Sequence, residues 1–198
     1  MSFIVGIDGP AGTGKGTITN LVAKDLKLNQ IDTGAMYRAF TLYMLDNKVE
    51  LDEIEKIKEL LEKVKIDLIQ EDDKETVFLN GKDVTKEIRS KSVTNFVSPV
   101  SSIIEVRIKM VELQRKMAEG KNVIMEGRDI TTYVFPNANV KIYLDANVEE
   151  RAKRRYKENI EKGMQTTFEE VLQDMKKRDY NDMHKPMGAL KVAEDAII

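Results

Sequence analysis

Short apolar runs separated by polar or glycine-containing segments recur along the chain and predict buried strands. Residues 3–8 (FIVGID), 122–125 (NVIM) and 140–144 (VKIYL) are apolar nearly throughout, as expected for strands covered on both faces. Residues 29–32 form a further short strand, and residues 196–198 form a final one. The pattern therefore predicts five short strands.

Apolar residues at helical spacing fill most of the chain between these runs. The expected helices cover residues 15–27, about 34–46 and 103–119, and Gly120 ends the last of them. Three residue pairs have the spacing of a capping box ahead of a helix: Asp52 and Glu55, Asn147 and Glu150, and Thr166 and Glu169. Strands that alternate with helices favour a mainly parallel sheet, with ligands at the carboxyl ends of its strands.

Residues 64–88 break this alternation. Val64–Gln70 alternates between apolar and polar positions, and a charged EDDKE turn follows. Thr76–Leu79 then leads into Asn80-Gly81, a dipeptide typical of tight hairpins. We interpret the stretch as a small antiparallel insertion, and an ordinary surface hairpin without a function is an equal alternative.

The predicted fold class is α/β, with a parallel five-stranded sheet flanked by helices. Residues 1–63 and 89–198 form the core domain, into which residues 64–88 are inserted. The chain of 198 residues is long enough to bury a substantial core.

Composition narrows the class of function. The 32 basic and 34 acidic residues leave a formal charge of −2, so the chain has no overall basic field for nucleic acid or an anionic membrane. The sequence contains no cysteine and only one histidine, His184, which excludes cysteine-bound metals and histidine metal clusters. No apolar run approaches the ~20 residues of a membrane-spanning helix. We expect a cytoplasmic protein whose anion binding is local.

The segment GPAGTGKGT follows the first predicted strand and opens the first predicted helix. This is the context of a phosphate-binding loop (P-loop), where free backbone N–H groups and the helix dipole favour an anion. Lys15 would supply positive charge for the β and γ phosphates. Thr17 is either a ligand of phosphate or magnesium, or an ordinary helix residue. The candidate ATP-binding residues of the loop are Gly9, Pro10, Ala11, Gly12, Thr13, Gly14, Lys15, Gly16 and Thr17.

Other motifs decide between the classes of P-loop protein. Switch GTPases need a D-x-x-G motif and an N-K-x-D motif, and this chain has neither; residues 47–50 read NKVE. A phosphotransferase instead needs cationic side chains that converge on two polyanions from several segments. Arg38 and Arg128 follow predicted strands, and Arg151, Arg154 and Arg155 share one helix face. Arg178 and Lys185 follow in RDYNDMHK.

The chain as a whole resembles the bacterial cytidylate kinases of the nucleoside monophosphate kinase superfamily. Their G-K-G-T loop ending is similar to the one found here, with Gly16 directly after Lys15. The other matching segments are DTGAMYR (32–38), IRS (88–90), VSPV and EVR (97–107), EGRD (126–129), VFP (134–136), ERAKRR (150–155) and RDYND (178–182). The match covers nearly the full chain in order, and the insertion is typical of the bacterial form.

The resemblance implies transfer of the ATP γ-phosphoryl group to CMP or dCMP by a monomeric enzyme, with Mg²⁺ that arrives with ATP. It assigns Lys15, Arg128, Arg154 and Arg155 to catalysis, the last two in a lid over about residues 147–166, and Arg151 to ATP. The implied CMP-binding residues are Thr33, Arg38, Ser98, Arg107, Arg128, Asp129, Arg178, Asp182 and Lys185. Asp129 and Ser98 would accept hydrogen bonds from the cytosine amine, and Arg107 would donate to N3 and O2.

Two positions depart from the family pattern. The family commonly has aspartate where Glu126 stands and arginine where Lys185 stands, and a lysine cannot form a bidentate fork with phosphate. Family members also continue into a helix beyond the final strand, and we expect a chain that stops before it to be less stable.

Several alternatives stay open. Ser98 is alternatively a helix cap, and Asp129 a salt-bridge partner of Arg128. The function is alternatively that of a kinase for another monophosphate or small metabolite, or of a regulatory module that binds nucleotide without turnover.

Overall fold

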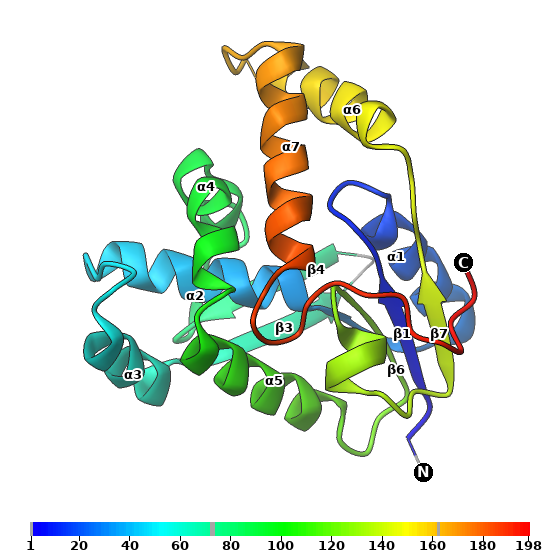
Figure 1. The fold of residues 1–198 in the computed structure, drawn as a ribbon. Coiled ribbons are helices and arrows are strands. Elements are labelled where there is room, and N and C mark those ends of the chain that lie inside the picture. Colours follow the sequence, from blue (N-terminus) through cyan, green and yellow to red (C-terminus); the bar gives the residue numbers. More distant parts are fainter. Residues whose placement is uncertain (1, 72–73, 162) are drawn as a thin grey trace.

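The computed structural model describes residues 2–71, 74–161 and 163–198. Its described residues contain a parallel sheet of four strands, ordered β2-β6-β1-β7 (Figure 1). The strands are β1 (Ile4–Asp8), β2 (Asn29–Asp32), β6 (Val123–Gly127) and β7 (Val140–Tyr143). All four match strands that the hydrophobic pattern predicts, to within two residues.

The apolar character of these strands reflects burial on both faces. Val123 and Met125 of β6 belong to the main hydrophobic core, whereas Ile124 packs with Val5 and Ile7 on the opposite face. Because side chains alternate along a strand, such a strand must be apolar throughout.

The register of the sheet decides where chemistry can occur. Asp8 at the end of β1 pairs with Gly127 of β6, and Asp32 at the end of β2 pairs with Glu126. The carboxyl ends of three strands therefore meet at one edge. Helices α6 and α7 stand over this edge (Figure 1).

The predicted fifth strand is not confirmed. Ile197 lies beside β7 and forms one isolated parallel bridge with Ile142. Ala196 instead donates its N–H to Ala193 O at 3.0 Å and so closes a turn at residues 194–195, which leaves Ile197 as the residue that pairs with β7. One bridge does not make a strand, and the sheet has four strands in the part of the chain described.

The helices follow the predicted spacing, and one further α-helix, α4, and two short helices, η1 and η2, were not predicted. Their bounds are α1 (Lys15–Leu26), α2 (Thr33–Asp46), α3 (Ile54–Lys63), α4 (Lys91–Val100), α5 (Ile104–Ala118), α6 (Val148–Glu161) and α7 (Phe168–Met183). The 3₁₀ helix η1 (Glu87–Arg89) and the π-helix η2 (Ile130–Val134) are short. The pattern did not predict α4, whose sequence KSVTNFVSPV is rich in β-branched and small polar residues and contains Pro99. Its start is fixed by Ser90, whose side chain accepts from Val93 N.

Two of the predicted capping boxes are wrong. Helix α3 begins after Glu53, which makes no side-chain cap hydrogen bond. Helix α7 does have a capping box, but one residue later than predicted, between Thr167 and Glu170. Ahead of α6, Asn147 Oδ1 accepts from Glu149 N at 2.8 Å.

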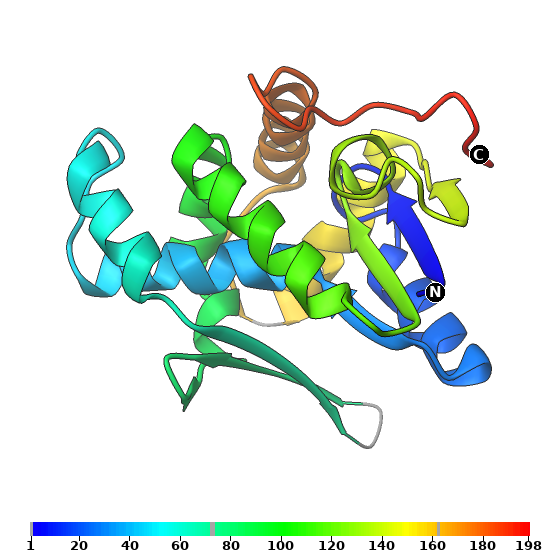
Figure 2. The same cartoon turned by 90° about the horizontal axis from the view of Figure 1, so that it is seen from below.

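The insertion is an antiparallel sheet, as predicted. It contains β3 (Ile66–Glu71), β4 (Lys74–Leu79) and β5 (Lys82–Asp83). Asn80 and Gly81 both have positive φ, 50° and 83°, as a tight hairpin turn requires. Part of the predicted EDDKE turn, residues 72–73, lies outside the described residues. Figure 2 shows this sheet set to one side of the main sheet, below α2.

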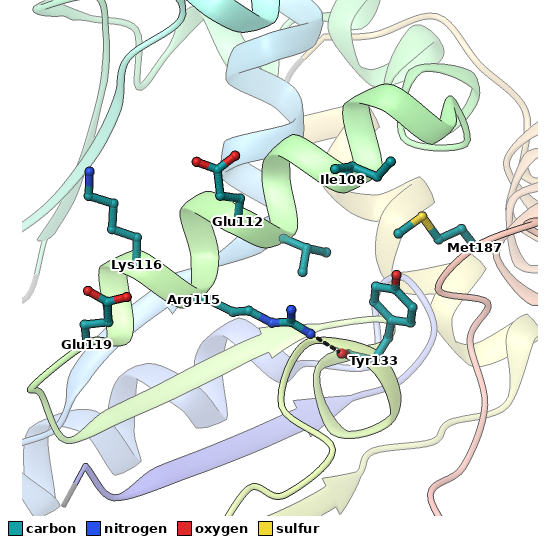
Figure 3. A pocket seen from close by; sticks show the side chains of 8 residues that line it. Ile108, Glu112, Arg115, Lys116, Glu119, Tyr133 and Met187 are labelled. Carbon is teal, nitrogen blue, oxygen red and sulfur yellow. Dashed lines mark hydrogen bonds between the residues drawn. The ribbon is translucent and has the colours of Figure 1, made fainter.

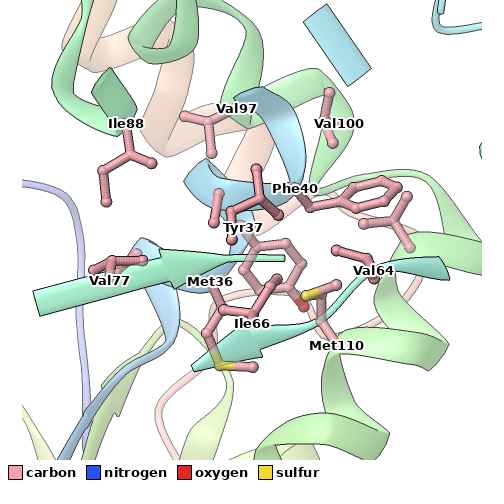
Figure 4. Close-up of a cluster of buried hydrophobic side chains, with 14 of the residues drawn as sticks. Met36, Tyr37, Phe40, Val64, Ile66, Val77, Ile88, Val97, Val100 and Met110 are labelled. Carbon is pink, nitrogen blue, oxygen red and sulfur yellow. The ribbon is translucent and has the colours of Figure 1, made fainter. Parts of the chain in front are cut away.

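The described residues of the insertion form no separate hydrophobic core. Ile66 and Val77 pack in the same cluster as Met36 and Phe40 of α2, both of which are fully buried (Figure 4). The insertion is thereby joined to the helix that follows Asp32 and Thr33.

Thr167→Ala tests the corrected capping box. The substitution removes the acceptor for Glu170 N, which Thr167 Oγ1 now binds at 3.2 Å, so unfolding free energy should fall by about 1 kcal/mol. Thr166→Ala is the matched control and should cost less than half as much. Urea unfolding of both variants measures this, and equal losses would contradict the assignment.

Candidate active site

Two hollows differ in chemistry. The larger, about 570 Å³, lies between α5, η2 and Met187 and is lined by Ile108, Val111, Glu112, Arg115 and other side chains (Figure 3). The smaller lies at the carboxyl edge of the sheet. Its lining residues are Thr33, Gly34, Tyr37, Val97, Ser98, Ser101, Gly127, Arg128, Asp129, Arg178, Asp182 and Lys185.

Unsatisfied polar atoms favour the smaller hollow, which we call the acceptor pocket. Among the described residues, the buried side-chain atoms without a hydrogen-bond partner include Ser98 Oγ and Arg178 Nε, both from residues that line it. None belongs to a described residue lining the larger hollow. Because native proteins rarely leave such atoms unpaired, the acceptor pocket is built for a polar ligand.

The glycine loop lies beside this pocket, between β1 and α1, as predicted. Gly14 has φ of 99° and is the N-cap of α1. Lys15 is buried, and its Nζ donates to Gly9 O and Pro10 O, both at 2.7 Å. The loop thus surrounds one positive charge at the amino end of a helix, which is an arrangement suited to phosphate.

Glu126 explains why glycine follows Lys15. A Cβ built on Gly16 would lie 3.2 Å from Glu126 Oε1. The carboxylate of Glu126, at the end of β6, therefore occupies the space where another P-loop carries a Ser or Thr side chain. A side chain at position 16 would crowd this carboxylate, which would have to shift by a few tenths of an ångström to make room.

Lys15 and Glu126 are both buried, and each influences the pKa of the other. Burial, with help from nearby Arg128, lowers the pKa of Lys15 to about 7. Burial and the neighbouring carboxylate of Asp32 raise the pKa of Glu126 to about 8. An anionic ligand at the loop would reverse the shift of Lys15 because it favours the charged ammonium.

Two of the three clustered arginines reach the loop. Arg151, on α6, is buried; its Nη1 donates to Ala11 O at 2.9 Å and its Nη2 pairs with Asp179 Oδ2 at 2.6 Å. Arg154 is exposed and donates to Gly12 O at 2.6 Å. The structure does not bring Arg155 to the loop, since it pairs with Glu158 on the same helix.

Arg128 and Lys185 converge on Asp182 in the acceptor pocket. Arg128 Nε donates to Asp182 Oδ2 at 2.7 Å, and Lys185 Nζ lies 2.8 Å from Asp182 Oδ1 and 2.9 Å from Ser101 Oγ. Burial alone would raise the pKa of Asp182, but Arg128, Lys185 and Arg178 together hold it well below its usual range. Burial lowers the pKa of Arg178 to about 9. This side of the pocket carries excess positive charge, which suits an anion.

Arg107 and Asp129 form a second buried ion pair near the acceptor pocket. Arg107 of α5 is 2% exposed, and it forms an ion pair with Asp129 and lies 5.3 Å from the ring centre of Tyr37. Burial raises the pKa of Asp129 to about 6 even though Arg107 opposes the rise. A pair of this kind offers both a donor and an acceptor to the edge of a planar ligand.

The structure contradicts two of the alternative roles that the sequence left open. Asp129 pairs with Arg107, whereas the partner of Arg128 is Asp182. Ser98 is no helix cap, because it lies within α4 and its hydroxyl is buried without a partner.

Two predicted residues lie on α2, and of these Thr33 lines the pocket whereas Arg38 does not. Thr33 is buried and donates its hydroxyl to Glu126 O at 2.7 Å. Arg38 donates to Thr94 Oγ1 at 3.1 Å, and burial lowers its pKa to about 10.

Several residues of this edge were not predicted from the sequence. Asp8 is fully buried and accepts hydrogen bonds from Ile130 N and Thr131 N at 2.8 and 2.7 Å. Asp179 forms an ion pair with Arg151, and Ser101 Oγ accepts a hydrogen bond from Lys185 Nζ. The position of Asp8 directly before the loop was the only signal available.

The geometry at the carboxyl edge of the main sheet indicates a class of protein. A phosphate loop that faces a second, cationic pocket across the ends of parallel strands is the arrangement of a P-loop phosphotransferase with two adjoining substrate sites.

Comparisons with known proteins give the family. A sequence model of the cytidylate kinase family matches residues 5–198, and the chain belongs to this family. Cytidylate kinases are nucleoside monophosphate kinases, which are phosphotransferases.

Curated relatives match over nearly the whole chain. The cytidylate kinase of Caldicellulosiruptor saccharolyticus is 49% identical over 98% of this chain and 86% of the relative. Those of Fusobacterium nucleatum and Bacillus subtilis are 49% and 46% identical, over 99% and 98% of this chain and 88% and 86% of the relatives. In the described part of the chain, no helix has the length and apolar character needed to cross a membrane.

Gly16→Ala tests the role of Glu126 in shaping the loop. The added methyl group would press on a buried carboxylate, so we expect kcat/KM for ATP to fall about tenfold. Glu126→Asp shortens the opposing side chain, and in that background the same substitution should cost less. Steady-state kinetics on the two single variants and the double variant decide; equal losses in both backgrounds would contradict the steric account.

Proton uptake tests the shifted pKa of Lys15. At pH 8, above a pKa of about 7, Lys15 is mostly neutral, and ATP added without Mg²⁺ should restore its charge. Calorimetry in two buffers of different ionisation enthalpy should therefore show uptake at pH 8 that fades toward pH 6. Lys15→Met should remove most of the uptake, and pH-independent binding with no uptake would refute the shift.

Proposed function

We propose that this protein transfers the γ-phosphoryl group of ATP to CMP or dCMP. The observation that carries the acceptor's identity is the Arg107–Asp129 pair with the unpartnered hydroxyl of Ser98 beside the same pocket. Asp129 and Ser98 can accept from the cytosine amine, while Arg107 can donate to N3 and O2. Uracil would instead bring an acceptor to acceptors, which disfavours UMP.

The remaining pocket residues suit the phosphate of CMP. Arg38, Arg128 and Lys185 would hold its oxygens, and Thr33, Arg178 and Asp182 would lie near the ribose or the phosphate. Asp182 already orients Arg128 and Lys185 through ion pairs at 2.7 and 2.8 Å, so their positive charges are fixed before the substrate binds. Preorganised charge of this kind stabilises the charge that develops during transfer.

ATP would occupy the loop from Gly9 to Thr17. Lys15 and Arg128 would neutralise charge on the transferred group from opposite sides. Arg151 and Arg154 already donate to loop carbonyls of Ala11 and Gly12, which supports their place beside ATP. Arg155 would join them when the lid, about residues 147–166 with residue 162 outside the described structure, closes and excludes water. No general base is needed, because the acceptor phosphate is already ionised.

Magnesium would accompany ATP. The oxygens of Thr17 and Glu126 are the hard ligands that Mg²⁺ prefers, and Glu126 lies over Gly16 at the start of α1. The described residues hold no cluster of three or more His, Asp or Glu side chains arranged for a metal. In this proposal the ion is held largely by ATP and water. When bound, the ion would neutralise phosphate charge. We also propose that the protein acts as a monomer in the cytoplasm.

An acceptor panel tests the function. ADP release from ATP, measured by a coupled assay, should be fastest with CMP and dCMP and much slower with UMP, AMP or shikimate. Preference for another acceptor would favour a kinase of different specificity, and nucleotide binding with no ADP release would favour a regulatory module.

Lys185→Arg tests the effect of having a lysine where the family commonly has an arginine. Lys185 Nζ already contacts Asp182 and Ser101, so one donor at most remains for a ligand, whereas an arginine fork could keep Asp182 and still reach phosphate. We expect KM for CMP to fall about fivefold with KM for ATP unchanged. An unaltered KM for CMP would show that the lysine does not weaken binding of the CMP phosphate.

A further inference from the structure

Asp129 lies at a position where an aspartate side chain normally caps the helix that follows it. It is the N-cap of the π-helix η2, and an aspartate there usually accepts from the backbone N–H groups of the first turn. Here its side chain makes no cap hydrogen bond and forms the ion pair with Arg107 instead. Something else must satisfy those N–H groups, because they are buried.

Asp8 performs that task from another strand. Its Oδ1 accepts from Ile130 N at 2.8 Å, and its Oδ2 accepts from Thr131 N at 2.7 Å and from Thr131 Oγ1 at 2.6 Å. Asp8 is 0% exposed, so no water competes for these bonds. The carboxylate at the end of β1 therefore caps a helix that begins more than a hundred residues later.

Glycines make this approach possible. A Cβ on Gly6 of β1 would lie 2.8 Å from Thr131 Cγ2, and one on Gly127 of β6 would lie 2.8 Å from Ile130 Cδ1. Both strands that flank the start of η2 thus lack the side chain that would push it away. The far end of η2 is held separately by Arg115, which donates to Val134 O and Tyr133 O at 3.0 Å each (Figure 3).

We propose that Asp8 is a specificity-determining positioning residue, which caps η2 in place of Asp129 and so frees Asp129 to pair with Arg107 and face the acceptor base. The inference rests on the proposed function, in which Asp129 accepts from the cytosine amine. Asp8 acts through Asp129 and touches neither substrate. Since Asp8 directly precedes Gly9, it also fixes the base-reading segment to the phosphate loop.

Asp8→Asn and Thr131→Val are the informative variants. Asp8→Asn puts an amide donor against the N–H groups of η2, so Asp129 should turn toward its own helix and lose its hold on the amine. We expect the preference for CMP over UMP in kcat/KM to fall about tenfold, chiefly through KM for CMP. Thr131→Val removes one of the three hydrogen bonds and should give a smaller fall in the same direction; if Asp8→Asn does not fold, Thr131→Val decides alone.

Arg115→Gln is the matched control. It frees the opposite end of η2, so it should lower the melting temperature but leave the CMP-to-UMP preference unchanged. An equal loss of preference in Arg115→Gln would show that loosening η2 anywhere has the same effect, which would overturn the proposal. Unaltered preference in folded Asp8→Asn, or in Thr131→Val, would also overturn it.

A double variant tests whether Asp8 acts through Asp129. In the Asp129→Asn background, Asp8→Asn should cost little further preference, whereas additive losses would refute the link. Failure of the proposed function is separately visible, because the unmodified protein would then not prefer CMP over UMP at all.

Discussion

The parallel pairing of β1 with β6 is the constraint on which the site depends. Its register places Asp8 opposite Gly127, so the glycine loop after β1 and the EGRD segment that ends β6 leave the sheet side by side. A slip of one residue would turn every side chain to the other face and separate the two segments. Close packing opposes that slip, because Gly6 of β1 and Gly127 of β6 lie where a Cβ would meet η2 at 2.8 Å. Packing against η2 thus helps to keep the two segments together.

The same edge carries charges whose burial would be costly if they were unpaired. Arg107 with Asp129, Arg128 with Asp182, and Arg151 with Asp179 each keep a guanidinium out of water beside a carboxylate. Burying such pairs adds little stability on balance, because desolvation offsets most of the attraction. Their effect is on orientation, because each carboxylate holds the side chain of its arginine in one direction. The unpartnered atoms Ser98 Oγ and Arg178 Nε mark what the pairs leave for a ligand.

Local features of the site could be predicted from sequence, and long-range ones could not. The glycine loop is recognisable because its backbone conformation, strand and helix are all encoded within about twenty residues. The roles of Arg107 and Asp129 could be expected from family resemblance alone, since no spacing brings residues 107 and 129 together. Asp8 escaped notice because its partners Ile130 and Thr131 depend on sheet register. Helix α4 was missed because β-branched residues and Pro99 weaken its local signal, which tertiary packing overrides. The predicted final strand is reduced to a single bridge at Ile197, because the N–H of Ala196 closes a turn by bonding Ala193 O.

In our proposal, a preformed acceptor pocket reads the cytosine edge. Calorimetric titration of CMP and of UMP into the protein, in the same buffer and without ATP, measures this discrimination. We expect CMP to bind at least about tenfold more tightly than UMP, and Asp129→Asn to remove most of the difference. Equal affinity of the unmodified protein for the two nucleotides would contradict it.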